Sequence, residues 1–250
     1  MLLPISDDDR RLHRPGYVTI LLILANLAVF FLLQRMGADS EFTYGWSVIP
    51  LEITTGEDIT EDQTLTVDGQ QIEVPQASGP TPIYLTILSA MFMHAGFAHL
   101  FFNLLFLWIF GDNVENRFGA LTFLGFYLAC GVAATVAQIA LDPDGVIPNL
   151  GASGAISGVL GAYLVLFPRN RVKTLFFWYI ISVPAVVAIG LWIALQLVSG
   201  YGAVMVAEET VGGVAYGAHI GGFFAGLLVA LVLRLVIPAR GRGRAPAEFR

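Results

Sequence analysis

The sequence predicts an all-α polytopic membrane protein, a six-transmembrane-helix bundle with a small β-hairpin in its first extracytoplasmic loop. Its 250 residues are 56% hydrophobic and 13% charged, whereas soluble domains are roughly 25% charged. The mean hydropathy is +0.72, and apolar runs near the roughly 20 residues that span a bilayer recur along the chain. These observations exclude an ordinary soluble domain. A net charge of −6 without a basic stripe argues against nucleic-acid binding.

Six apolar segments are the candidate spans, and they lie at 17–33, 83–110, 121–141, 150–167, 175–198 and 211–237. The second and the last are longer than a bilayer needs, so we expect part of each to lie outside the hydrocarbon. A cleaved signal peptide is the other interpretation of the first segment. No clear small-residue cleavage site follows that segment, which favours an uncleaved helix.

The placement of charge predicts the orientation. With six spans and a cytoplasmic N-terminus, 12 of the 13 Lys and Arg residues fall inside, and only Arg35 lies at an outer end. The positive-inside rule therefore puts both termini in the cytoplasm, and a bacterial cytoplasmic (inner) membrane is the simplest location. The expected organisation is a cytoplasmic segment 1–16, a membrane domain 17–237, and a basic, disordered cytoplasmic tail 238–250 that can contact anionic lipid headgroups.

The first outer loop, 37–82, carries nine acidic residues and no basic one. Within it, residues 64–74 alternate in polarity on both sides of Asp68-Gly69. That dipeptide is a strong signal for a two-residue hairpin turn, so we expect two paired strands here.

Polar side chains inside the spans mark the candidate site, because each costs free energy in lipid unless it faces the bundle interior. A helix rises about 1.5 Å per residue, so counting back from the charge that ends each span puts Ser153 at roughly 24 Å, His219 at roughly 22 Å and His99 at roughly 20 Å from the cytoplasmic side. Asn103 follows His99 by one turn on the same face. These four side chains can therefore meet near the outer surface. The full set of polar residues in the spans, with no Asp or Glu among them, is His94, His99, Asn103, Gln138, Ser153, Ser157, Gln196 and His219.

Ser153 and His219 form a candidate Ser-His dyad, since a serine hydroxyl is a weak nucleophile until an imidazole accepts its proton. Ser153 lies in Gly151-Ala-Ser-Gly154 at a predicted helix start, where free N–H groups stabilise a developing oxyanion. His99 and Asn103 can donate from the side. Because no carboxylate lies in the spans, the tautomer of His219 must be controlled from elsewhere.

Each of these features also has a structural interpretation. Ser153 alone is typical of a helix N-cap, and His99 and Asn103 alone are typical of hydrogen bonds between membrane helices. The Gly-x-Ser-x-Gly elbow is not matched, because residue 155 is Ala. Glycines on the fourth and last spans, including Gly222, predict close approach of those two helices. The shared depth of the polar residues favours the catalytic interpretation.

Four motifs follow one another between residues 83 and 237, and they are His94-Ala-Gly-Phe-Ala-His99-Leu-Phe-Phe-Asn103, Gly111 with Glu115-Asn-Arg-Phe-Gly119, Gly151-Ala-Ser153-Gly154-Ala, and Gly217-Ala-His219-Ile-Gly-Gly222. In this order they resemble the rhomboid family of intramembrane serine proteases. The resemblance implies a six-helix bundle that cleaves membrane-anchored proteins near the outer edge of a transmembrane segment, with no cofactor and no metal. It implies these roles: nucleophile Ser153, general base His219, an oxyanion hole of His99, Asn103 and the backbone N–H groups of Ser153 and Gly151, and support from His94, Gly154 and Gly222.

The chain also departs from the family. One bacterial branch carries Tyr four residues after the nucleophile, where this chain has Ser157, so the group that packs on His219 is open. The first loop has Trp46-Ser47 in place of a Trp-Arg pair found in some members. The resemblance further implies that substrate enters between the second and fifth helices, with the loop 199–216 as a lid and facing surfaces that include Phe102, Phe106, Trp178 and Trp192.

Three other functions compete with proteolysis. The first is a catalytically inactive rhomboid-like protein that binds transmembrane helices without cutting them. A channel or transporter would need an intramembrane charge or a broken-helix repeat, which the sequence lacks. A zinc protease is disfavoured because no His-Glu-x-x-His occurs. The substrate, the cut site and the oligomeric state stay open.

Overall fold

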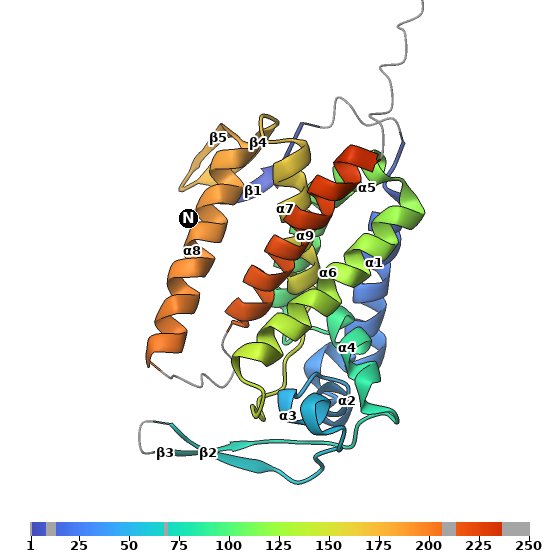
Figure 1. Cartoon of the computed structure of the whole chain (residues 1–250), viewed down its shortest axis with the longest axis vertical. Helices are drawn as coiled ribbons and strands as arrows, with labels where there is room; N and C mark the ends of the chain where they lie inside the picture. Colours follow the sequence, from blue (N-terminus) through green and yellow to red (C-terminus); the bar gives the residue numbers. More distant parts are fainter. Residues whose placement is uncertain (1, 9–13, 68–69, 207–213, 237–250) are drawn as a thin grey trace, which may run out of the picture.

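The computed structural model describes residues 2–8, 14–67, 70–206 and 214–236. Helix α7 (Ser153–Leu166) is the core of a helical bundle, and its residues from Gly154 to Tyr163 are all buried. The small residues along α7 let its neighbours pack close around it, whereas α8 (Ala185–Val206) stands at the outer edge of the bundle (Figure 1). The remaining long helices are α1 (Tyr17–Ala28, continued by a π-helical turn at Val29–Leu33), α5 (Phe97–Phe118), α6 (Ala120–Leu141) and α9 (Tyr216–Val236).

Short elements close the two ends of the bundle (Figure 1). The strands are β1 (Leu2–Ser6), β2 (Gln63–Val67), β3 (Gln70–Val74), β4 (Arg171–Phe176) and β5 (Tyr179–Pro184). The short helices are α2 (Ser40–Gly45), α3 (Pro50–Thr55) and α4 (Thr86–Ser89), with 3-10 turns at Arg35–Gly37, Ile83–Leu85 and Ala90–Phe92. A three-stranded antiparallel sheet, in the order β1-β4-β5, covers one end. The β2-β3 pair, α2 and α3 lie at the other end.

In the part of the chain that the structure describes, three helices are long and apolar enough to cross a membrane, namely α5, α6 and α9. Shorter apolar helices cover Tyr17–Leu33, Ile83–Phe92, Ser153–Leu166 and Ala185–Tyr201. The second expected span is therefore divided, because short helical turns precede Gly96 and α5 begins only at Phe97. The count of six spans stays a prediction.

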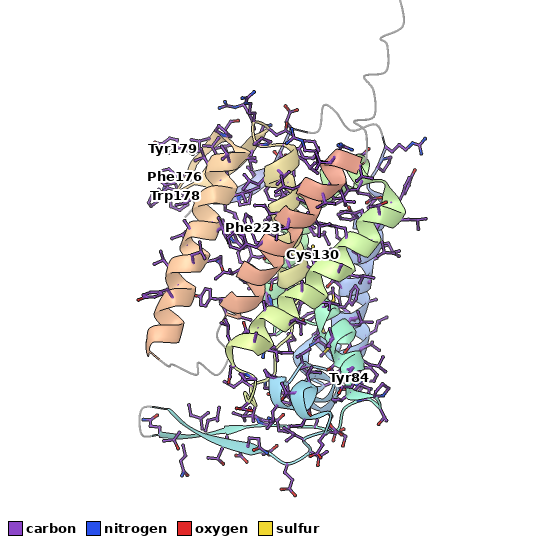
Figure 2. All side chains as sticks on the ribbon, in the orientation of Figure 1. Tyr84, Cys130, Phe176, Trp178, Tyr179 and Phe223 are labelled. Atoms are coloured by element: carbon purple, nitrogen blue, oxygen red, sulfur yellow. The ribbon has the colours of Figure 1, made fainter. Side chains whose placement is uncertain are left out.

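The expected fifth span, 175–198, is wrong in its first ten residues. These residues form the end of β4 and all of β5, which pair antiparallel from Arg171↔Pro184 to Phe176↔Tyr179. The helix α8 begins at Ala185, directly after Pro184, because proline has no N–H to give to a helix interior but is tolerated at a helix start. Trp178 is thus at the hairpin tip and 91% exposed (Figure 2). It does not lie on the fifth helix facing α5.

Within the loop 37–82, the strands β2 and β3 pair from Gln63↔Val74 to Val67↔Gln70. The turn residues Asp68 and Gly69 lie outside the described residues, as do the tail 238–250 and residues 207–213 of the expected lid. Helix α8 extends to Val206, so the loop expected at 199–216 is shorter than predicted.

Glycines bring α7 and α9 into backbone contact. A Cβ added at Gly222 would lie 2.1 Å from the Gly154 carbonyl oxygen, and one at Gly226 would lie 2.1 Å from the Gly158 carbonyl oxygen. Any side chain at these positions would therefore push the helices apart. This small-residue contact fixes the first turn of α7 against the first turns of α9.

Hydrogen bonds to a carboxylate fix α1 against α5. The Glu115 carboxylate accepts hydrogen bonds from the backbone N–H groups of Val18 (3.0 Å) and Thr19 (2.8 Å) and from the Thr19 hydroxyl (2.9 Å). The first N–H groups of a helix lack intrahelical partners, and a carboxylate there also complements the helix dipole. Glu115 therefore caps α1 from the neighbouring helix.

Candidate active site

Ser153 and His219 lie within hydrogen-bonding distance of each other. The Ser153 Oγ is 2.7 Å from the Nε2 of His219. Ser153 is the first residue of α7 and His219 lies in the first turn of α9, so the glycine contact between these helices brings the two side chains together. The depth count from the sequence placed the same two residues at one level.

The opposite edge of the His219 ring and one of its faces contact α8. Its Nδ1 is 2.7 Å from the Oε1 of Gln196. The Trp192 ring, one helical turn before Gln196, packs on the imidazole with 6.1 Å between centroids and 36° between planes. Trp192 therefore occupies the packing role that the sequence left open at Ser157. The Ser157 hydroxyl instead donates to the Ser153 carbonyl at 2.6 Å.

The His99 ring lies against Gly151, which is also close to the Ser153 hydroxyl. A Cβ at Gly151 would be 2.9 Å from the Cε1 and 3.0 Å from the Nε2 of His99, and its φ of +138° disfavours other residues. The Nδ1 of His99 accepts the Ala95 N–H at 3.3 Å. In the neutral imidazole this leaves the hydrogen on Nε2, which faces the space beside Ser153.

The role expected of the Gly151 N–H is wrong in this structure. That N–H donates to the Ala90 carbonyl at 2.8 Å and is not free to bind an oxyanion. Gly151 contributes space for the His99 ring instead. Because Ser153 is the first residue of α7, its own N–H has no intrahelical acceptor. It remains the backbone candidate for binding an oxyanion.

Asn103 is 7% exposed and lies one turn along α5 from His99. Its Nδ2 donates to the His99 carbonyl at 3.0 Å. An amide NH2 carries two hydrogens, so one remains for a ligand after this bond. Asn103 and His99 line the same cavity as Ser153 and His219, which brings the four sequence-predicted polar residues to one place.

His94 lies beneath this cluster. It is fully buried, and its ring meets the His99 ring edge-on with 5.1 Å between centroids. The Gln34 amide brackets its backbone, accepting the His94 N–H at 2.8 Å and donating to its carbonyl at 3.1 Å. The ring nitrogens have no hydrogen-bond partner among the described residues. The supporting role that the resemblance implied for His94 stays a prediction, because the hydrogen bonds to Gln34 involve only the backbone of residue 94.

The cavity over the cluster has a volume of about 730 Å³. Its walls come from α5, α7, α8 and the start of α9, and residues between Gly37 and Pro75 close one side. The expected facing residues Phe102, Phe106 and Trp192 line it. The cavity is large enough for an extended stretch of peptide and is mostly apolar, and its polar lining residues include His99, Asn103, Ser153 and His219.

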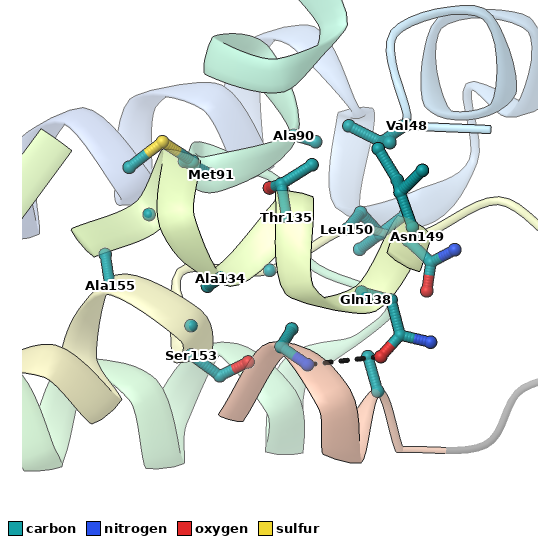
Figure 3. Close-up of a pocket in the computed structure, with 16 residues that line it drawn as sticks. Val48, Ala90, Met91, Ala134, Thr135, Gln138, Asn149, Leu150, Ser153 and Ala155 are labelled. Carbon is teal, nitrogen blue, oxygen red and sulfur yellow. Dashed lines mark hydrogen bonds between the residues drawn. The ribbon is translucent and has the colours of Figure 1, made fainter. Parts of the chain in front are cut away.

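A smaller cavity of about 40 Å³ also has Ser153 in its wall (Figure 3). Here the Gln138 Oε1 accepts the Ala218 N–H at 3.1 Å, which fixes the residue before His219. Gln138 was a candidate in the sequence, but its partner could not be predicted. Among the described residues, no group of three or more His, Cys, Asp or Glu side chains could hold a metal ion.

Comparison with known proteins gives consistent results. The family described as "Rhomboid domain" matches residues 83–235. The chain is 39% identical over 121 residues to the rhomboid protease GluP of Bacillus subtilis, covering 48% of this chain and 22% of GluP. It is 30% identical over 174 residues to the mitochondrial rhomboid protein 1 of Saccharomyces cerevisiae, covering 66% of this chain and 46% of that protein. A third relative, the putative rhomboid protease YdcA of Bacillus subtilis, is 36% identical over 87 residues, covering 34% of this chain and 43% of YdcA. The chain spans less than half the length of each of these relatives.

Proposed function

The chain belongs to the rhomboid family, and we propose that it is an intramembrane serine endopeptidase that cleaves transmembrane segments of membrane-anchored proteins near the extracytoplasmic side. The protease names of the relatives and the apolar helices support a multi-pass membrane protease. The observation that carries the proposal is the 2.7 Å contact between the Ser153 Oγ and the His219 Nε2. Both termini lie in the cytoplasm of a bacterium in this proposal.

In the proposed reaction the Nε2 of His219 accepts the Ser153 proton while Oγ attacks the scissile carbonyl carbon. The carbonyl oxygen becomes an oxyanion, which the Nε2–H of His99, the free Asn103 amide hydrogen and the Ser153 N–H stabilise. The protonated His219 then donates to the leaving amine as the C–N bond breaks. Water, deprotonated by the same imidazole, hydrolyses the acyl-enzyme and restores Ser153.

The site favours a transmembrane substrate because it opens into an apolar cavity between α5 and α8. An unwound stretch of a membrane helix can expose a carbonyl to Ser153 there, while the apolar walls contact its side chains. The outer loop at one side of the cavity supports an opening toward the extracytoplasmic face.

The test uses the full chain in proteoliposomes with a single-span substrate that carries small residues near the outer end of its membrane segment. We expect the wild type to release two fragments, and mass spectrometry to place the cut in the outer part of the segment. Ser153→Ala and His219→Ala should each abolish the cut. If a folded wild type bound the substrate without cutting any of a set of such segments, the alternative of an inactive helix-binding protein would replace this proposal.

A further inference from the structure

The general base of a Ser-His dyad must hold its hydrogen on one particular ring nitrogen. To accept the Ser153 proton at Nε2, a neutral His219 must carry its hydrogen on Nδ1. In many serine proteases a buried carboxylate holds that hydrogen in place. No Asp or Glu lies within the predicted spans of this chain, so another acceptor is required.

The structure puts that acceptor on α8. The Oε1 of Gln196 lies 2.7 Å from the Nδ1 of His219, opposite the 2.7 Å contact between Nε2 and Ser153. An amide oxygen can only accept a hydrogen bond, so this contact requires the hydrogen on Nδ1 and leaves the Nε2 lone pair toward Ser153. Gln196 and Ser153 therefore hold the imidazole from both sides.

We infer that Gln196 is the positioning residue that fixes the tautomer and orientation of His219, in the place that a carboxylate occupies in a Ser-His-Asp triad. This inference rests on the proposed function. A neutral amide suits a helix that crosses lipid, where an ionised carboxylate costs much more to bury. It stabilises an imidazolium less than a carboxylate would, because an amide carries no negative charge to attract the protonated ring.

The position of Gln196 links the base to α8. Trp192 packs on the imidazole from the same face of the same helix, four residues earlier. One helix thus supplies both the acceptor for Nδ1 and the surface that supports the ring. A displacement of α8 from this position would release His219 from both contacts.

The decisive variant is Gln196→Leu, which keeps the bulk of the side chain and removes the acceptor. In proteoliposomes we expect kcat for a transmembrane substrate to fall about 10- to 100-fold with KM within about twofold, since the loss affects the chemical step. This is smaller than the roughly 10⁴-fold loss in a triad in which an amide imposes the wrong tautomer. Gln196→Glu retains an acceptor oxygen whether or not it is ionised, so it should recover most of the activity. Gln196→Met replaces Gln196→Leu if the branched side chain prevents folding.

The matched control is Leu195→Ala, at the neighbouring and 56% exposed position of α8, which should leave kcat unchanged. Wild-type kcat in Gln196→Leu would overturn the inference and leave the proposed function standing. So would equal losses in Gln196→Leu and Gln196→Glu accompanied by the same fall in melting temperature, because that result assigns Gln196 a structural role. A folded wild type without proteolytic activity would instead overturn the proposed function.

Discussion

At the scale of single residues, the geometry of the site requires that residue 151 be a glycine, which has no side chain. Its φ of +138° and the closeness of the His99 ring leave no room for a Cβ. We expect Gly151→Ala to displace His99 and lower kcat at least tenfold while the helices remain folded. A single oxyanion donor contributes about 10²- to 10³-fold to kcat in known serine proteases, which sets the upper range for this loss.

The control for this variant is Gly125→Ala on α6, where an added Cβ meets nothing within 4 Å. Cleavage assays and circular dichroism on both proteins provide the comparison. Equal activity of Gly151→Ala and wild type would show that the His99 position does not matter for catalysis.

The residues at the site differ in how far the sequence could predict them. Ser153, His219 and His99 could be brought together by counting residues, because the rise of a helix is regular and each span ends at a charge. The partner of the His219 Nδ1 could not be found in this way. Gln196 was visible as a polar residue in lipid, but its partner depends on the rotation of α8 about its axis, which residue counting leaves undetermined. The resemblance implied a role for the Gly151 N–H in the oxyanion hole, and residue counting could not show that this N–H donates to the Ala90 carbonyl, in a turn far earlier in the chain.

At the scale of elements, the α7–α9 contact predicts that a Gly→Ala substitution lowers the stability of the protein, which is the opposite of its usual effect in a helix. Gly→Ala in a helix interior normally stabilises by about 1 kcal/mol. At Gly226 the new Cβ would instead lie 2.1 Å from the Gly158 carbonyl oxygen, and overpacking typically costs about 1–3 kcal/mol. We expect Gly226→Ala to lower the melting temperature in detergent.

Gly190→Ala on α8 is the matched substitution, since a Cβ there meets nothing within 4 Å. It should leave the melting temperature equal or higher. A rise in melting temperature for Gly226→Ala as well would contradict the direct backbone contact between α7 and α9.

The loop 37–82 contains a buried carboxyl group, Glu52, from which we expect a pH-dependent effect on stability. Glu52 is 1% exposed, and burial, with the nearby Asp58 carboxylate as a smaller cause, raises its pKa from 4.5 to about 7. The folded protein therefore binds more protons than the unfolded protein between these values, so its stability falls as the pH rises from about 4.5 to about 7. We expect Glu52→Gln to reduce this pH dependence and to be more stable than wild type above pH 7.

Thermal unfolding at several pH values between 5 and 8 checks this expectation. The amide oxygen of Glu52→Gln can still accept the Ile59 N–H, which the carboxylate accepts at 2.8 Å in the wild type. Glu57→Gln, at an exposed carboxyl group in the same loop, is the control. An unchanged slope in Glu52→Gln would contradict the assignment.

The β4–β5 hairpin shows why the helix boundaries were less predictable than the site. Residues 175–198 form a continuous apolar run, which fits a buried helix and a strand equally well by periodicity. Val172, Ile181 and Val183 are β-branched and favour the strand, and Pro184 marks the start of the helix. The length of the run predicted a single span here. The local residue types instead favour a hairpin followed by α8, which is what the structure has.

At the scale of the whole molecule, α8 takes part in both proposals, the entry of substrate and the positioning of His219. It lines the cavity opposite α5 and also holds His219. We expect a flexible crosslink between cysteines introduced at Phe102 on α5 and Leu195 on α8, in a Cys130→Ala background, to block cleavage of a transmembrane substrate. Labelling of Ser153 by a small reagent should persist, because α8 stays in place. Unchanged cleavage after complete crosslinking, measured against the uncrosslinked double variant, would contradict entry between these helices.

The claim on which the whole account depends is that His219 activates Ser153, and labelling of the purified protein with a fluorophosphonate serine probe tests it most directly. We predict that the wild type is labelled at Ser153, as shown by peptide mass spectrometry, and that Ser153→Ala and His219→Ala are folded but unlabelled. A folded wild type that the probe does not label, or labelling that persists in His219→Ala at the wild-type rate, would contradict it.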